Sequence, residues 1–224
     1  MIPELEPHEE EARLEAQRLA DQLLRPNADA WEERAEFPRA AFRRLCEAGF
    51  GAALAPRSEG GLALSNLGAL AVFEALGRAD LAIPFALLVQ NNCVRSILQH
   101  GSEEQRRRWL PPLVSGQSVG SYAITEPEAG SDAASMSSSA RGIDGGWLLD
   151  GEKCLLSNAP AAELFLVCAK TDPERGAHGV SAFLVDRNAP GLEIGAREQT
   201  LGTRALAVGS LRMKDCRVAG EALL

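Results

Sequence analysis

The chain has 224 residues, of which 46% are hydrophobic and 24% charged, so it can bury a core in one large domain or two modest ones. Its formal net charge of −8 and sequence pI of about 5.0 argue against a nucleic-acid-binding protein with a basic face. No apolar run approaches the length of a membrane span, and the acidic N-terminus does not resemble a signal peptide. We therefore expect a cytoplasmic protein with neither a nucleic-acid partner nor a membrane span.

The cysteines and histidines do not indicate a metal site. The five cysteines are scattered without a Cys-x-x-Cys pair, which favours reduced, mostly buried thiols over a disulfide framework or a zinc site. The three histidines lie in unrelated contexts with no paired spacing. The sequence also lacks a Gly-x-Gly-x-x-Gly fingerprint, a P-loop and a nucleophile elbow. Rossmann-type dinucleotide binding and a serine triad therefore have no support.

The first 116 residues have the hydrophobic periodicity of helices. Ser65 or Asn66 can cap one helix, and Ser102 and Gln105 have the spacing of a capping box. The patterns predict helices over residues 4–25, 38–49, 66–79, 84–100 and 102–112.

Two consecutive amides, Asn91 and Asn92, interrupt the apolar pattern of the predicted helix over 84–100. They could face a ligand, or they could form internal hydrogen bonds to a neighbouring helix. The second interpretation is favoured, because buried polar groups usually find partners inside the protein.

From Gln117 onward the pattern changes to short segments typical of strands, separated by Gly, Pro, Asp and Asn. Asp150-Gly151 predicts a tight hairpin turn, because a primed turn needs positive φ at both central positions. A helical half followed by a half made of strands predicts an α+β chain with two domains, residues 1–116 and residues 117–224. The strands are expected over residues 118–125, 135–143, 147–157, 163–171, 180–186 and 207–218.

The segment Tyr122–Asp132 combines a strand end with a forced turn. Pro127 fixes one φ angle and removes a backbone donor, so the strand should stop there. Gly130 can take positive φ, and Ser131 and Asp132 suit a turn or cap, so the hydroxyls of Thr125 and Ser131 could converge with loop N–H groups on a polar ligand. The alternative is an ordinary corner between a strand and a loop.

The same segment resembles the flavin-contact signature of the acyl-CoA dehydrogenase family, Thr-Glu-Pro, any residue, then Ala-Gly-Ser-Asp. Lys153–Ala159 stands where the family has Lys, any residue, then Trp-Ile-Thr-Asn-Gly. The resemblance runs over essentially the whole chain and implies a helical N-terminal domain followed by an antiparallel β-barrel middle domain. Further segments in the family's order are Gly179–Val185, Pro190-Gly191, Leu201-Gly202 and Asp215–Leu224.

The resemblance implies FAD as the cofactor. It places Thr125 and Ser157 near the reactive edge of the isoalloxazine ring, and Ser131 on the acyl-thioester side as the candidate substrate contact. Leu155 stands where the family has Trp, and Ala159 where it has Gly, so an aromatic contact with the flavin is missing. The candidate cofactor-binding residues are Tyr122, Ile124, Thr125, Gly130, Ser131, Leu155 and Ser157.

The implied function is a flavin-dependent dehydrogenase of fatty acid metabolism that converts an acyl-CoA or acyl-carrier-protein thioester to the α,β-enoyl product. An electron-transferring flavoprotein is the expected acceptor, and a homo- or hetero-oligomer the expected assembly. In the family a glutamate base belongs to a second helical domain after the barrel, so no catalytic residue is assigned in residues 1–224.

Two alternatives remain open. One is a non-catalytic subunit of a hetero-oligomeric acyl-CoA dehydrogenase, which the replacement of Trp by Leu155 favours. The other is a flavin monooxygenase on the same scaffold, against which the well-kept string from Thr125 to Asp132 argues. The chain could be a fragment or a natural short subunit.

Overall fold

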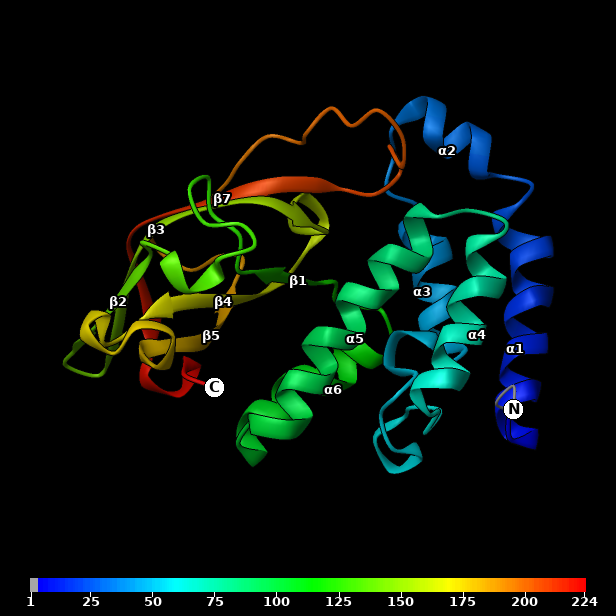
Figure 1. The fold of residues 1–224 in the computed structure, drawn as a ribbon, viewed down its shortest axis with the longest axis horizontal. Coiled ribbons are helices and arrows are strands. Elements are labelled where there is room, and N and C mark those ends of the chain that lie inside the picture. The colour runs from blue at the N-terminus through cyan, green and yellow to red at the C-terminus, as the bar shows by residue number, and fades with distance from the viewer. Residues whose placement is uncertain (1–3) are drawn as a thin grey trace. The chain divides into compact units, whose positions relative to one another are not determined.

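The computed structural model describes residues 4–224, and these residues form two compact units, one of helices and one of strands (Figure 1). The helical unit extends to Gln99 and includes Arg106–Gln117 and the late segment Gln199–Leu206. The strand unit comprises His100–Gln105, Ser118–Glu198 and Ala207–Leu224. No helix in the described part of the chain combines the length and apolarity that a membrane crossing would require.

The predicted helices are present, with shifts of a few residues at their ends. Ser65 caps α4, because its hydroxyl accepts a hydrogen bond from Gly68 N at 3.2 Å. A short helix, α2, was not predicted, since it buries no residue and therefore shows no apolar periodicity. The helices are α1 (Pro7–Leu19), α2 (Ala28–Arg34), α3 (Arg39–Glu47), α4 (Asn66–Gly77), α5 (Ala82–His100) and α6 (Glu103–Val114), and a π-helical segment, Ala20–Leu24, continues α1.

Helix α5 contributes many of the buried side chains of the helical unit, and Asn91 fixes its position. The Asn91 side chain accepts a hydrogen bond from Ala53 N at 2.7 Å and donates to Phe50 O at 2.7 Å. The expectation of internal bonding is therefore confirmed for Asn91, although the partner is the 3₁₀ turn Phe50–Ala52 and the residue after it, not a helix. Asn92, in contrast, is exposed.

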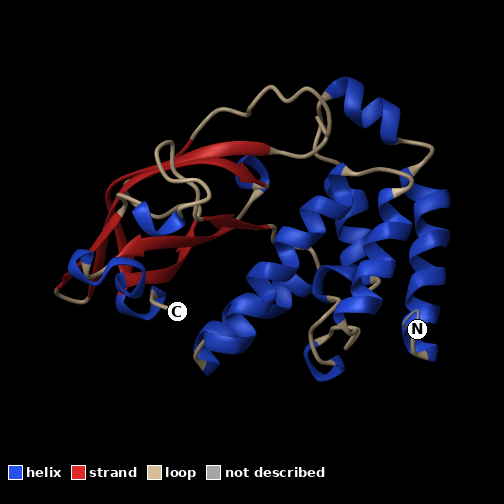
Figure 2. Ribbon diagram, viewed as in Figure 1, coloured by secondary structure: helices blue, strands red, loops and turns tan. Residues whose placement is uncertain are grey.

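The strand unit is built on a single curled sheet (Figure 2). Strands β1 and β4 run parallel, as does the single residue pair between β2 and β4, so the expectation of a purely antiparallel barrel is wrong. The β2–β3 hairpin intervenes between β1 and β4, and this crossover lets β4 return beside β1 in the same direction. The strands are β1 (Gly120–Ala123), β2 (Ser139–Ile143), β3 (Gly146–Ser157), β4 (Leu164–Lys170), β5 (Val180–Asp186), β6 (Leu192–Ile194) and β7 (Val208–Ala219).

The predicted hairpin turn at Asp150-Gly151 is wrong, because β3 runs through both residues as a continuous strand. Gly151 has a φ of 139° and lies at an irregularity in the pairing of β3 with β7. A Cβ atom there would lie 2.8 Å from Ser138 Cα, so close backbone approach requires glycine at a bulge. The Asp150 carboxylate accepts a hydrogen bond from Asp215 N at 2.8 Å and so joins the two strands.

We predict that Asn91→Ala lowers the free energy of unfolding by about 2–4 kcal/mol, because Ala53 N and Phe50 O lose their partner in a buried environment. Asn92→Ala is the matched control, since it removes an exposed amide from the next position and should cost less than about 0.5 kcal/mol. Urea denaturation of both variants measures the difference. Equal losses would show that the Asn91 hydrogen bonds do not stabilise this unit.

Candidate functional site

The chain that follows β1 lies beside the end of β3. Cys154 N donates a hydrogen bond to Thr125 O at 3.0 Å, and the Ser121 hydroxyl donates to Ser157 O at 2.8 Å. The Asn158 side chain adds a bond to Gly120 O at 3.0 Å. These contacts place Thr125 next to the Cys154–Ser157 segment, so two of the sequence motifs meet in space.

A bulge in β3 determines which side chains this segment presents. Lys153 and Leu156 are both buried, at 0% and 2% exposure, although residues three apart in a regular strand point to opposite faces. The pairing with β7 shifts between these residues, which turns both inward. Leu155 is left with a φ of 54° and a 66% exposed side chain. It is therefore an apolar side chain held outward by a backbone conformation that leucine rarely adopts.

A buried ion pair lies beneath this surface. Lys153 Nζ is 2.7 Å from Glu126 Oε1, and the two side chains are 0% and 3% exposed. Lys153 also donates to Ile124 O at 3.2 Å, so one ammonium group holds both the end of β1 and the loop that follows it. The pair thereby connects the segment carrying Thr125 to the segment carrying Leu155.

Glu126 also closes the loop that contains Gly130 and Ser131. Its carboxylate accepts hydrogen bonds from Ser137 N at 2.6 Å, the Ser137 hydroxyl at 2.7 Å and Ser138 N at 3.0 Å. Burial by itself would raise the pKa of Glu126, but the hydrogen bonds from Lys153, Ser138 and Ser137 outweigh it and lower the pKa to about 2. The carboxylate is therefore charged throughout the physiological pH range.

The predicted site residues fall into two groups. Thr125, Leu155 and Ser157 lie together where β1 and β3 end, with Tyr122 and Ile124 partly buried beside them in sequence. Gly130 and Ser131 are exposed residues of the loop between Glu126 and Ser137.

Gly130 does not use the positive φ that glycine allows, since this residue is not among the glycines in the left-handed region. A Cβ atom at Gly130 would meet no heavy atom within 4 Å. Neither the backbone conformation nor packing within the described chain therefore requires glycine at this position.

Glu126 and Lys153 are the residues of this site that the sequence did not single out. A signal was present, because Lys153 stands in a strand between the apolar pairs Leu148-Leu149 and Leu155-Leu156. A lysine inside such a pattern indicates a buried partner of opposite charge. Which of the many acidic residues is that partner becomes visible only in the fold. As for metals, residues 4–224 contain no group of three or more His, Cys, Asp and Glu side chains arranged to bind an ion.

A helical unit and a curled mixed sheet, with the ends of β1 and β3 joined by the Glu126–Lys153 ion pair, define the fold class of the chain. Two family models match it: "Acyl-CoA dehydrogenase, N-terminal domain" over residues 6–117 and "Acyl-CoA dehydrogenase, middle domain" over residues 121–216. The chain belongs to the acyl-CoA dehydrogenase family.

Individual relatives agree with this assignment. The chain is 37% identical over 199 residues to the mitochondrial isobutyryl-CoA dehydrogenase of Dictyostelium discoideum, which covers 89% of this chain and 48% of that protein. This chain thus spans about half the length of the curated relatives it matches.

Solved structures also superpose closely on the chain. A glutaryl-coenzyme A dehydrogenase in its glutaryl-CoA complex has a TM-score of 0.93 at 32% identity, covering 100% of this chain and 58% of that one. A structure of PigA with FAD and proline has a TM-score of 0.95 at 28% identity, covering 100% and 59%.

We predict that the Glu126 carboxylate contributes about 3 kcal/mol of stability at neutral pH, because its pKa is lowered from 4.5 to about 2. A depressed carboxyl pKa stabilises the fold above the unfolded value, so this contribution is lost as the pH falls from about 4.5 through 2. The free energy of unfolding is measured by urea denaturation at several pH values. The double variant Glu126→Gln/Lys153→Met removes the pair and serves as the reference. The gap between the two proteins should shrink at acid pH, and parallel pH profiles would contradict the assignment.

Proposed function

We propose that this chain forms the flavin-binding part of an acyl-thioester dehydrogenase. FAD would contact Tyr122, Ile124, Thr125, Gly130, Ser131, Leu155 and Ser157, with Ser131 also on the side of the acyl thioester. The observation that carries the proposal is Leu155, which is exposed and held at a φ of 54°. A non-glycine residue in this region costs roughly 1–3 kcal/mol, and such strain is concentrated at functional sites. A planar ring packed against Leu155 would account for the strained conformation at the bulge.

The hydroxyls beside Leu155 fit the same ligand. Neither Thr125 Oγ1 nor Ser157 Oγ has a hydrogen-bond partner within residues 4–224, and both side chains are partly buried. Two partly sheltered hydroxyls beside an apolar surface suit the edge of an isoalloxazine ring, which carries both donors and acceptors. They would orient the ring and stabilise negative charge on its reduced form.

The chemistry divides between the cofactor and the protein. FAD, when bound, accepts a hydride from the β-carbon of the thioester. The residues of this chain bind and orient the reactants, and no glutamate among the site residues is proposed as the base that removes the α-proton. We propose that a part of the enzyme outside these residues supplies that base.

An apolar groove of the helical unit is the proposed site of the acyl chain. It has a volume of about 360 Å³ and presents four exposed hydrophobic side chains from α4, α5 and the turn between them. A group of exposed apolar side chains in one groove indicates a binding site for a ligand or partner, whereas single exposed apolar side chains do not. These side chains are Leu70, Leu81, Phe85 and Leu88.

The proposal includes the wider context of the enzyme. The substrate is an acyl-CoA or acyl-carrier-protein thioester, the electron acceptor is an electron-transferring flavoprotein, and the enzyme works as an oligomer in the cytoplasm. The functional division of the chain is proposed at residues 116 and 117, with flavin contacts in the second part.

A second candidate is a non-catalytic subunit that keeps the fold for assembly with an intact homologue. The absence of an aromatic ring at Leu155 favours it, because stacking on the flavin is then lost. The two candidates differ in whether this chain binds FAD.

We predict that FAD binds the purified chain, as measured by the change in visible absorption on titration and after gel filtration. Thr125→Ala/Ser157→Ala should weaken the affinity about tenfold or more, since each lost hydrogen bond contributes roughly 0.5–1.5 kcal/mol. Ser139→Ala, which removes an exposed hydroxyl from β2, should leave the affinity unchanged.

Leu155→Trp should tighten FAD binding by restoring an aromatic surface. A chain that takes up no FAD, even as this variant, would refute the flavin-binding role and support the non-catalytic subunit. Equal affinities for the wild type and the Thr125/Ser157 variant would show that FAD binds elsewhere.

A further inference from the structure

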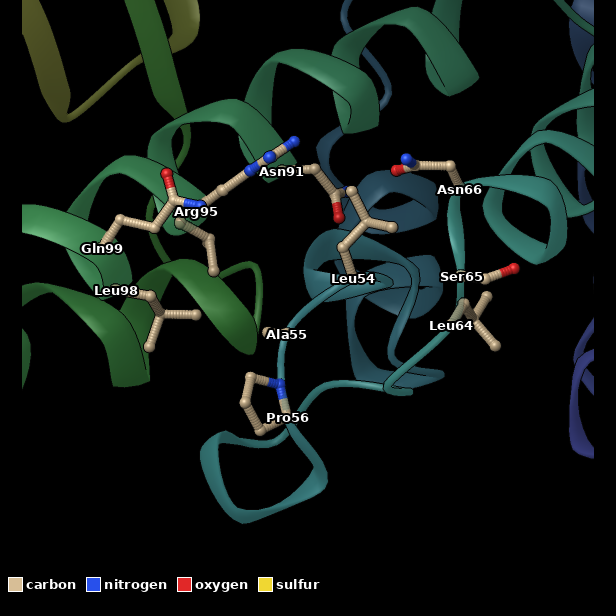
Figure 3. Close-up of a pocket in the computed structure, with 11 residues that line it drawn as sticks. Leu54, Ala55, Pro56, Leu64, Ser65, Asn66, Asn91, Arg95, Leu98 and Gln99 are labelled. Atoms are coloured by element: carbon tan, nitrogen blue, oxygen red, sulfur yellow. The ribbon is translucent and has the colours of Figure 1, made fainter.

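A second cavity of the helical unit lies between α5, the Leu54–Pro56 segment and the start of α4 (Figure 3). Its volume of about 580 Å³ falls within the range of small-molecule sites. Six of its lining side chains are apolar, and these are Leu54, Ala55, Pro56, Leu64, Val94 and Leu98.

Arg95 gives this cavity its charge. It forms no ion pair or hydrogen bond with any residue of the described chain, whereas Arg13, Arg18 and Arg43 on other helices each have a carboxylate partner three or four residues away. None of the residues found to line the cavity is acidic. Arg95 is exposed, so its guanidinium is a solvated positive charge, paired with no carboxylate, that a ligand in the cavity can reach.

Two further donors line the cavity with Arg95. Asn66 and Gln99 are exposed residues whose side-chain amides have no hydrogen-bond partner within residues 4–224, so both are available to a ligand. Asn91 differs, since its amide is occupied by Ala53 N, Phe50 O and Leu87 O and serves only as part of the wall. Figure 3 shows Arg95 and Gln99 on α5 and Asn66 across the cavity at the start of α4.

We propose that this cavity binds the carboxylate of an aliphatic carboxylic acid, with its hydrocarbon chain against the apolar walls. A planar guanidinium matches a carboxylate with two parallel hydrogen bonds, and one cation balances its single charge. A phosphate group carries nearly two charges, and the cavity offers no second cation among its lining residues. This site is distinct from the proposed flavin contacts, and binding there requires neither FAD nor turnover.

The test is calorimetric titration of the wild-type chain with octanoate, and with octanamide as a neutral probe of nearly the same shape. Octanoate should bind, and octanamide should bind at least about tenfold more weakly, because it lacks the charge that Arg95 recognises. Arg95→Gln should weaken octanoate binding by a similar factor and leave octanamide unaffected. Arg78→Gln is the matched control, since it removes an exposed arginine from the end of α4 outside the cavity.

Two more variants fix the location of binding. Leu98→Trp should fill the cavity and abolish octanoate binding while Arg95 is retained, and Leu14→Trp, at an exposed position of α1 outside the cavity, should leave octanoate binding unchanged. Thermal unfolding confirms that each variant is folded. Equal binding of octanoate and octanamide, full affinity in Arg95→Gln, or no binding at millimolar octanoate would overturn the proposal. None of these results depends on whether the chain binds FAD.

Discussion

The buried ion pair between Glu126 and Lys153 is the contact on which the candidate site depends. It joins the loop after β1 to β3, and the same two side chains hold Ile124 O, Ser137 and Ser138. Removing two charges from water offsets much of their attraction, so such a pair contributes less net stability than its 2.7 Å separation suggests. We infer that its main effect is to select one arrangement of the two segments, because any other arrangement leaves a buried charge unpaired.

The bulge in β3 links this pair to the surface. Lys153 reaches Glu126 only because it points inward, and Leu156 points inward only because the strand gains a residue between them. The same extra residue forces Leu155 outward at positive φ. The buried charge, the irregularity in the sheet and the exposed apolar side chain therefore all follow from one local backbone path. A substitution at Lys153 should consequently alter the backbone conformation at Leu155.

Hydrophobic periodicity was sufficient to predict the long helices and most of the strands, because burial of one face imposes it. Helix α2 was not predicted, because it buries no residue. Asp150-Gly151 was wrongly predicted to form a turn, because the same residue pair also occurs at a β-bulge. The motif residues Thr125, Leu155 and Ser157 were predicted from resemblance, and the structure brings them together. The Glu126–Lys153 partnership could not be predicted, since its partners are 27 residues apart and only the sheet joins them.

Amide hydrogen exchange of the chain, with and without saturating FAD, tests most directly whether the corner formed by β1 and β3 is the flavin surface. Exchange should slow in two separate segments, residues 122–125 and residues 154–157, because hydrogen bonding and exclusion of water would protect both at once. Protection in Lys153→Met should be reduced in both segments together. Flavin-dependent protection confined to the helices, or none in either segment, would contradict the central claim.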